Sequence, residues 1–202
     1  MHFTRIEHLP TIIEHGLMSD RLARNRGVLS VEIGDRGIKQ QRLDNRVDCG
    51  PGGAVADYAP LYFAPCSPMM SGLAHGKYTY RDGFNEVIYL VTTMEDLHAA
   101  GCSTVVTDRN AALAIAAMST DEADWSEFVD WDLMQAKWWF NTPEYPDRRE
   151  RRMAEALVHG SIPFAAFRSI VTKTDATALS VRGILAEAGI DLTVAVRPHW
   201  YF

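Results

Sequence analysis

The 202-residue sequence contains no apolar stretch approaching the roughly 18 uncharged residues that a membrane-spanning helix needs. Its first residues, MHFTRIEHLP, lack the basic segment and the apolar run of a secretory signal. Cysteine is scarce, because Cys49, Cys66 and Cys102 are the only three and they include no Cys-x-x-Cys pair. These absences argue against a membrane protein and a disulfide framework, and they predict a cytoplasmic chain with reduced thiols.

Sequence signatures of several enzyme classes are also missing. The seven histidines show no His-Glu-x-x-His or similar ligand spacing, so we expect no metal site. No Gly-x-Gly-x-x-Gly or Walker-type loop is present, which leaves the common phosphate-binding scaffolds unsupported. No Gly-x-Ser-x-Gly elbow marks a serine hydrolase.

The composition is that of a globular protein. An apolar fraction of 47% with 10% aromatic residues suits a chain with its own core, and we expect one domain over residues 1–202. The net charge of −6, from 20 basic and 26 acidic residues, argues weakly against general nucleic-acid binding. A local basic patch can still bind phosphates, because phosphate binding depends on the local electrostatic field and not on the net charge of the chain.

The predicted elements alternate irregularly, without the strand–helix–strand rhythm of a doubly wound protein, so we expect an α+β fold. Strands are predicted at residues 58–64, 86–92, 103–107, 155–159, 168–173 and 192–196. Helices are predicted at residues 6–16, 38–45, 67–76, 94–100, 109–118, 125–140 and 175–189, with a proline-punctuated loop at 141–147.

Glu155 interrupts the apolar run MAEALV. In an extended strand it shares a face with Leu157 and His159, because side chains alternate in direction. A carboxylate on an apolar strand costs free energy to desolvate unless it is paired or lies in a cleft. The residues alone leave both options open: an exposed strand end or an ion pair with Arg151 or Arg152, and a functional carboxylate in a cleft.

Other polar residues are less specific. Arg42 lies in the charged segment IKQQRLDNR and is most simply part of a solvated helix. His2 and Thr4 flank Phe3, which predicts an edge strand with both polar side chains on one side. The segment YAPLYFAPCSPMM is core plus a turn, or the wall of an aromatic cleft for a flat ligand.

Aromatic residues and arginines are interleaved in WDLMQAKWWFNTPEYPDRRERR. Bases stack on aromatic rings while arginines neutralise phosphates, so this mixture suits single-stranded nucleic acid. The alternative is that Trp138 and Trp139 belong to the core and the arginines to a solvated face. Burial is favoured for the tryptophans, and the arginines remain open.

Six segments occur here in the order found in the DarT-type toxins, which are DNA ADP-ribosyltransferases of bacterial toxin–antitoxin systems. They are HFTRIEHLPTIIEHGLMS, IKQQR, GPGGAVADYAPLYFAPCSPMM, VIYLVT, TDRNAA and RRMAEALVHGSIPF. The chain resembles this family from His2 to the terminal WYF. The resemblance implies an ADP-ribosyltransferase fold whose central split β-sheet clamps NAD. It also implies transfer of ADP-ribose from NAD to a thymine base in single-stranded DNA, with release of nicotinamide.

The resemblance also assigns roles to residues. It makes Glu155 catalytic, as a fixed carboxylate that stabilises the positive charge growing on the ribose. It makes Arg42 a ligand of the NAD phosphates that also takes part in handling the thymine ring proton. Phosphate binding is the favoured part, since arginine stays protonated at neutral pH. The further cofactor-binding residues implied are His2, Thr4, Thr11, Tyr62, Ser67 and Met70. Residues 110–155 correspond to the substrate-recognition region, whose implied DNA contacts are Asn110, Arg148, Arg149, Arg151 and Arg152.

The chain departs from the family pattern at three positions. Cys66 stands where an arginine is usual, Leu61 replaces a common phenylalanine, and Asn110 occupies a position that is histidine in some members. These departures bear on the shape of the cofactor pocket. The implied partners are single-stranded DNA and a macrodomain antitoxin of the DarG type, with no membrane. Two alternatives stay open: the same fold with another acceptor (guanine in DNA, an RNA base or a protein), and a non-catalytic nucleic-acid-binding domain.

Overall fold

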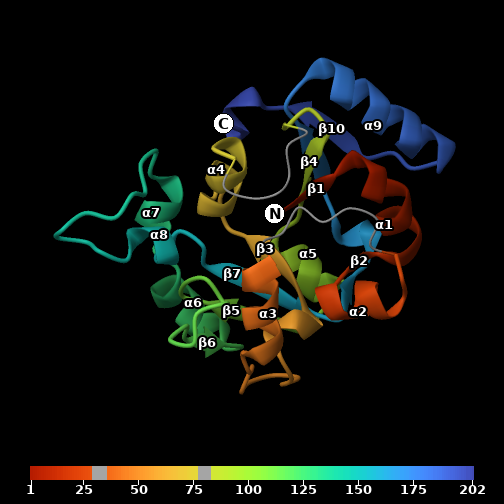
Figure 1. Ribbon diagram of the computed structural model, residues 1–202. Coiled ribbons are helices and arrows are strands. Elements are labelled where there is room, and N and C mark those ends of the chain that lie inside the picture. The colour runs from red at the N-terminus through yellow and green to blue at the C-terminus, as the bar shows by residue number, and fades with distance from the viewer. Residues whose placement is uncertain (29–35, 77–82) are drawn as a thin grey trace.

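The computed structural model describes residues 1–28, 36–76 and 83–202. Within them the strands form two four-stranded sheets and a two-stranded ladder (Figure 1). The first sheet has the order β1 (His2–Arg5), β4 (Val87–Val91), β9 (Ser169–Thr172), β10 (Thr193–Val196). The second has the order β3 (Tyr58–Tyr62), β7 (Glu155–His159), β5 (Thr104–Thr107), β6 (Met118–Ser119), and β2 (Leu17–Met18) pairs with β8 (Ser161–Ile162).

The helices of the described residues are short, apart from the last. They are α1 (Leu9–His15), α2 (Asp20–Asn25), α3 (Arg36–Asp44), α4 (Pro68–Ala74), α5 (Met94–Ala99), α6 (Glu122–Phe128), α7 (Trp131–Gln135), α8 (Arg148–Arg151) and α9 (Asp175–Glu187). No helix in this part of the chain combines the length and the apolar composition that a bilayer crossing requires.

Backbone hydrogen bonding links the two sheets where β1 approaches β3. The amide of Tyr62 donates to the carbonyl of Met1 at 2.7 Å, and the His2 ring bonds the carbonyl of Pro60 at 2.8 Å. Beyond this contact the strands follow different sheets, since β1 pairs with β4 and β3 pairs with β7. The result is an α+β fold with a split central sheet, as the sequence predicts.

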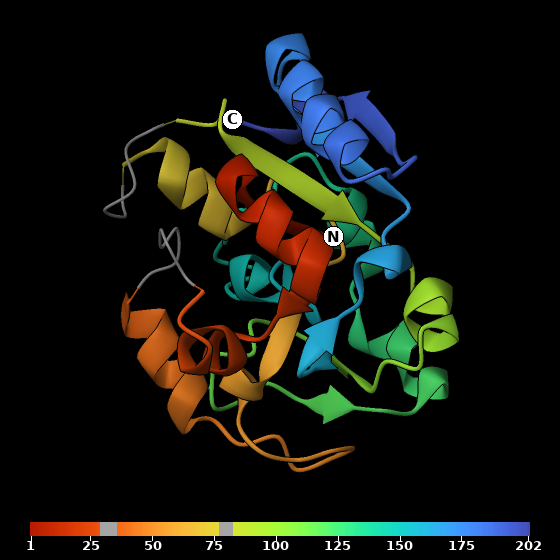
Figure 2. The same cartoon turned by 90° about the vertical axis from the view of Figure 1, so that its right-hand side faces the viewer.

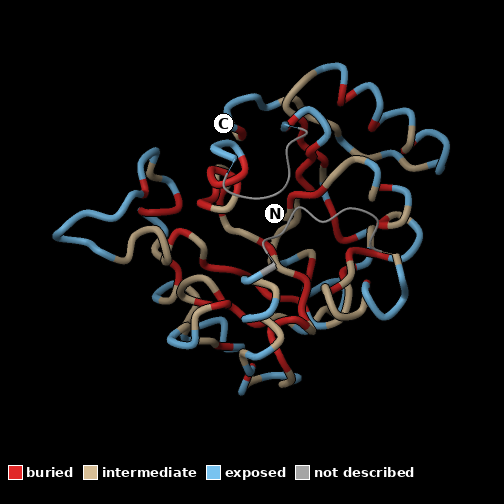
Figure 3. Tube along the Cα trace, in the orientation of Figure 1, coloured by how far each residue is buried: buried red, intermediate tan, exposed pale blue. Residues whose placement is uncertain are grey.

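The core lies on both faces of the first sheet (Figures 2 and 3). In β4, Ile88 and Leu90 pack toward α1, α5 and α9, whereas Val87 and Tyr89 pack toward α4 and the C-terminal residues. A strand covered on both faces needs apolar residues throughout. This explains the continuous run VIYLV.

Most predicted elements are present, but two predicted helices are wrong. Residues 109–118 form turns that end in β6, because the Asp108 carboxylate accepts from the amide of Ala117 and the Asn110 side chain accepts from the amide of Ala112. Local side-chain bonds of this kind compete with helix formation. Residues 125–140 hold only α6 and α7, because Asp130 caps a new helix through the amide of Leu133 at 2.9 Å.

Candidate active site between the two sheets

A cavity of about 430 Å³ lies between β1 and β3, within the size range of small-molecule sites. Its walls come from β1, β3, the start of β7, helices α1 to α4, and the turn and helix that precede β7. The predicted site residues that line it are His2, Thr4, Thr11, Arg42, Tyr62, Asn110, Arg149 and Glu155. Residues separated by up to 153 positions in the sequence therefore face one space.

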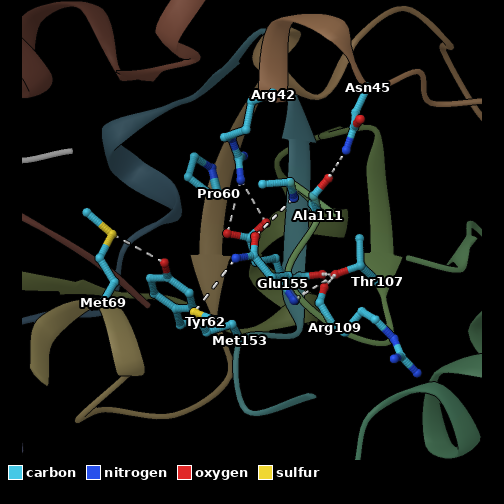
Figure 4. A network of polar contacts seen from close by, with 12 residues as sticks. Arg42, Asn45, Pro60, Tyr62, Met69, Thr107, Arg109, Ala111, Met153 and Glu155 are labelled. Atoms are coloured by element: carbon cyan, nitrogen blue, oxygen red, sulfur yellow. Dashed lines mark hydrogen bonds and ion pairs between the residues drawn. The ribbon is translucent and has the colours of Figure 1, made fainter. Parts of the chain in front are cut away.

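Glu155 is the first residue of β7 and is only 2% exposed. Both of its carboxylate oxygens accept from Nη1 of Arg42, at 3.2 and 2.9 Å (Figure 4). Its amide donates to the hydroxyl of Thr107 at 2.9 Å, which fixes the start of the strand. The interpretation as an exposed strand end is wrong, and so is the ion pair with Arg151 or Arg152.

Arg42 reaches Glu155 from α3, and its side chain is only 11% exposed. One helical turn earlier, Lys39 donates to Asp20 at 2.7 Å and ties α3 to α2. The interpretation of Arg42 as a solvated helix residue is therefore wrong. Nη2 of Arg42 is buried and has no hydrogen-bond partner among the described residues. A buried donor without a partner costs free energy, so this atom is suited to bind an anionic or hydroxyl group of a ligand.

His2 presents a hydrogen-bond acceptor to the cleft. Its Nδ1 lies 2.8 Å from the carbonyl of Pro60, which can only accept, so Nδ1 carries the proton. Burial, helped by the nearby positive charges, lowers the pKa of His2 from 6.5 to about 4. The ring is therefore neutral at pH 7, and Nε2 keeps a lone pair. Beside it, the hydroxyl of Thr4 lies 2.9 Å from Nδ1 of His8.

The low pKa of His2 predicts a pH dependence of stability. Unfolding raises this pKa toward 6.5, so the unfolded chain takes up a proton between pH 6.5 and 4 that the folded chain refuses. This residue's contribution to the free energy of unfolding is present above pH 6.5 and falls as the pH drops, by at most ~3 kcal/mol. Urea titrations of wild type and His2→Asn should show the stability difference shrinking over that interval. A pH-independent difference would contradict the prediction.

The four arginines before β7 have different environments. Arg149 lines the cavity, and Arg148 donates from Nη2 to the carbonyl of Trp138 at 2.9 Å. Arg151 is held by Asp130 at 2.7 Å and Asp147 at 3.2 Å. Arg152 is 5% exposed and donates to the carbonyls of Leu133, Met134 and Pro65 at 2.5, 2.6 and 2.8 Å. The guanidinium of Arg152 is thus bonded inside the protein, so the structure supports a structural role for Arg152, and the predicted DNA contact stays untested.

Replacing Arg152 should accordingly destabilise the protein. Arg152→Met removes three hydrogen bonds to carbonyls, of which only that of Leu133 also accepts from a backbone amide, that of Ala136 at 3.2 Å, among the described residues. We expect the free energy of unfolding to fall by about 2–4 kcal/mol. Arg148→Met, at the start of α8 and with one bond to a carbonyl, should cost under about 1 kcal/mol. Equal urea midpoints for the two variants would contradict the structural role of Arg152.

Comparison with known proteins identifies the family. The profile described as "ssDNA thymidine ADP-ribosyltransferase, DarT" matches residues 1–202. The chain belongs to the DarT family. A DNA ADP-ribosyl transferase of Thermus sp. (strain 2.9) is 30% identical over 204 residues, which cover 100% of this chain and 94% of the relative.

Solved structures of the Thermus DarT share the fold. Its complex with ADP-ribosylated ssDNA matches with a TM-score of 0.91 at 29% identity, over 100% of this chain and 94% of that one. Its complex with NAD+ matches with a TM-score of 0.86 at 28% identity, over 100% and 96%. A Thermosipho africanus DarTG in complex with ADP-ribose matches in fold, with a TM-score of 0.82 at 17% identity, over 100% of this chain and 50% of that one. The predicted ADP-ribosyltransferase fold is thus confirmed.

Two residues predicted for the NAD-binding element of this DarT chain do not line the cavity. Ser67 is 1% exposed and caps α4, where its hydroxyl accepts from the amide of Met70 at 3.2 Å. Met70 is fully buried, and its sulfur accepts from the hydroxyl of Tyr89 at 3.0 Å. The side chains of both residues therefore hold α4 in place, and their assignment to NAD binding stays a prediction. Met69 lines the cavity instead and accepts from the hydroxyl of Tyr62 at 3.6 Å.

Sequence reasoning missed further residues of the cavity wall. Lys39 lies three residues before Arg42 and so on the same side of α3, a spacing that could have revealed it. Glu150 and Met153 line the cavity from the segment before β7. No cluster of histidine, cysteine or acidic residues among those described is arranged to hold a metal ion.

The family departure at Cys66 lies behind the cavity wall. Cys66 has a positive φ of 53°, an unusual conformation for a residue with a side chain. Its carbonyl accepts from Nε1 of Trp139 at 3.1 Å, and the preceding carbonyl accepts from Arg152. This corner, directly before α4, is therefore bonded to Trp139 and Arg152, which lie in the segment between α7 and β7. Leu61, another departure, is buried in the core.

Proposed function

We propose that this DarT chain transfers ADP-ribose from NAD to a thymine base in single-stranded DNA. The observation that carries the proposal is the buried pair of Glu155 and Arg42 on the wall of the cleft, with Nη2 of Arg42 left without a partner. Family membership supports the reaction, and the complexes of the Thermus protein with NAD+ and with ADP-ribosylated ssDNA support both substrates.

The residues of the cleft fit NAD in chemical type. Nη2 of Arg42 offers a charged donor to the diphosphate, and phosphate oxygens are the acceptors that a guanidinium binds best. Neutral His2 offers an acceptor from Nε2 to a ribose hydroxyl or the nicotinamide amide. Thr4, Thr11 and Tyr62 border the same space. We assign these residues to NAD binding.

Glu155 is assigned to the chemical step. The bond between the nicotinamide nitrogen and C1 of its ribose breaks, the ring nitrogen N3 of thymine bonds to that carbon, and the proton of N3 is released. Positive charge grows on the ribose as neutral nicotinamide leaves. A carboxylate fixed beside it lowers the energy of that state, because it is already oriented and shielded from water. Its pairing with Arg42 holds the carboxylate in a fixed orientation.

Asn110 and Arg149 are assigned to the DNA. The amide of Ala112 donates to Oδ1 of Asn110 at 3.0 Å, and one hydrogen of the Asn110 NH2 group is directed to the sulfur of Met153 at 3.8 Å, so the other hydrogen of this cavity-lining side chain can donate to a ligand. Thymine offers two carbonyl acceptors to such a donor. Arg149 places a cation at the rim for the phosphate backbone.

The acceptor is tested by intact-mass measurement of synthetic oligonucleotides incubated with the protein and NAD. The set contains single-stranded DNA with and without one thymine, the matching duplex, and the corresponding RNA. We expect a gain of one ADP-ribose on the thymine-containing single strand alone. Modification of thymine-free DNA or RNA would replace the acceptor, and an absence of any gain despite DNA binding would favour a binding module.

A macrodomain antitoxin of the DarG type is the proposed protein partner. Modified bases in its own DNA would harm the cell, so an activity that removes ADP-ribose is needed beside this one. The Thermosipho chain named DarTG is about twice as long as the part matched here, in keeping with a second component. Reversal of the oligonucleotide mass gain by such a macrodomain would support the pairing, and a stable adduct would count against it.

A further inference from the structure

Residues 136–147, between α7 and α8, form a largely exposed segment at the outside of the molecule (Figures 1 and 3), and this segment carries exposed aromatic side chains. Trp138 is 65% exposed and Phe140 is 55% exposed. Their ring centroids lie 6.0 Å apart, and the two planes differ by 29°, so they present neighbouring, nearly parallel faces. Large exposed aromatic faces mark interaction surfaces. We call Trp138 and Phe140 the aromatic platform.

The platform rests on a rigid support. Trp139 between them is only 4% exposed, donates from Nε1 to the carbonyl of Cys66 at 3.1 Å, and packs its ring 4.7 Å from that of Phe140. Arg148 donates to the carbonyl of Trp138 at 2.9 Å. Binding to a surface that is already ordered loses less conformational entropy. A ligand that stacks on the platform therefore has little ordering of the protein to impose.

Two basic side chains, Lys137 and Arg148, lie beside the platform. Nζ of Lys137 lies 5.5 Å from the centroid of the Trp138 ring. Arg148 adds a second cation from α8. Flat aromatic faces beside cations match the alternating bases and phosphates of a single nucleic-acid strand.

The platform is continuous with the cleft. The amide of Arg149 donates to Oδ1 of Asn141 at 2.7 Å, and Nδ2 of Asn141 donates to the carboxylate of Glu150 at 3.3 Å. Arg149 and Glu150 both line the cavity that contains Glu155. The same short helix thus supports the segment that carries the platform and forms the rim of the site.

We propose that the platform is a second base-binding subsite, where an unmodified base flanking the target thymine stacks on Trp138 and Phe140. This proposal rests on the proposed function, since its occupant is the same DNA strand. Every base has a π face, so stacking accepts any of the four. The platform therefore sets the affinity and the required length of the strand, while the cleft sets which base is modified.

The test is an abasic scan without NAD, so that no transfer occurs. The probe is a fluorescein-labelled 12-nucleotide single strand with one central thymine among deoxyadenosines. Single abasic sites replace each flanking base in turn. Dissociation constants are measured for wild type, Trp138→Ala, Phe140→Ala and the control Trp131→Ala. Trp131 is also an exposed tryptophan, at 43%. It lies on α7, where its ring packs against that of Phe63, and it is not part of the platform.

We expect Trp138→Ala and Phe140→Ala to bind the intact strand about ten- to a hundredfold more weakly, because one stacked base is lost. Trp131→Ala should bind like wild type. An abasic site at one flanking position should weaken wild-type binding by a similar factor and leave Trp138→Ala unchanged. The slope of log affinity against log salt should be the same in wild type and Trp138→Ala, because stacking releases no counterions.

Wild-type affinity in Trp138→Ala and Phe140→Ala would overturn the proposal, and so would an abasic effect of equal size in wild type and Trp138→Ala. Failure of the proposed function gives a different result. If the wild-type protein neither binds the strand nor modifies it with NAD, the reaction itself is wrong. If the wild-type protein binds and modifies the strand, and the platform variants bind it with wild-type affinity, only the proposed base-binding role of the platform is wrong. A protein partner then becomes the candidate occupant.

Discussion

Glu155→Gln is expected to lower the rate of ADP-ribose transfer by at least a hundredfold to a thousandfold while leaving NAD affinity and folding nearly intact. The carboxamide has almost the shape of the carboxylate and still accepts a bond from Arg42, but it carries no charge to stabilise the ribose. Since this interaction matters mostly in the transition state, the loss should appear in the rate and not in binding. Nicotinamide release with a single-thymine oligonucleotide measures the rate, and NAD titration calorimetry measures the affinity.

The matched control for that substitution is Glu187→Gln, the same chemical change at an exposed position at the end of α9. It should transfer ADP-ribose at the wild-type rate. If Glu155→Gln also did so, Glu155 would not be the catalytic carboxylate, whatever its burial.

Arg42→Met should be the most destabilising change in the cleft. It leaves a carboxylate that is 2% exposed without the guanidinium that pairs with it, and we expect the free energy of unfolding to fall by about 3–5 kcal/mol at pH 7. Urea unfolding at pH 7 measures this change.

The double variant Arg42→Met with Glu155→Gln separates charge from shape. With no buried charge left, it should recover much of the stability lost in Arg42→Met, in urea unfolding followed by circular dichroism. Both variants should be inactive. If the double variant were no more stable than Arg42→Met alone, the unpaired charge of Glu155 would not be the cause of the stability lost in Arg42→Met.

Much of the fold follows from local pattern, as β4 and the start of α4 illustrate. The run VIYLV predicts a strand because every residue in it is apolar and three are β-branched, and the structure covers both of its faces. Ser67 followed by Pro68 predicts the start of α4. The alanine-rich run at 109–118 fails, because bonds from Asp108 and Asn110 replace the helical ones.

The site was harder to predict, because its partners are distant in the sequence. Nothing in IKQQRLDNR shows that Arg42 is buried against a residue 113 positions away. The family resemblance, and not the pattern, placed Arg42 and Glu155 in one site. A shift of one residue along α4 decides that Met69 and not Met70 faces the cavity. Arg149 lies within α8 and Arg152 directly follows this helix, and that difference in position directs the side chain of Arg152 into the protein.

The central claim is that the cleft between β1 and β3 binds NAD with its reacting ribose at Glu155. The most direct test is a crystal structure of Glu155→Gln with NAD, since this variant should bind the substrate without consuming it. We predict that the nicotinamide ribose lies within hydrogen-bond distance, about 2.6–3.2 Å, of the side chain at position 155, with a phosphate oxygen on Nη2 of Arg42. NAD bound elsewhere, or with its nicotinamide ribose turned away from position 155, would contradict the account.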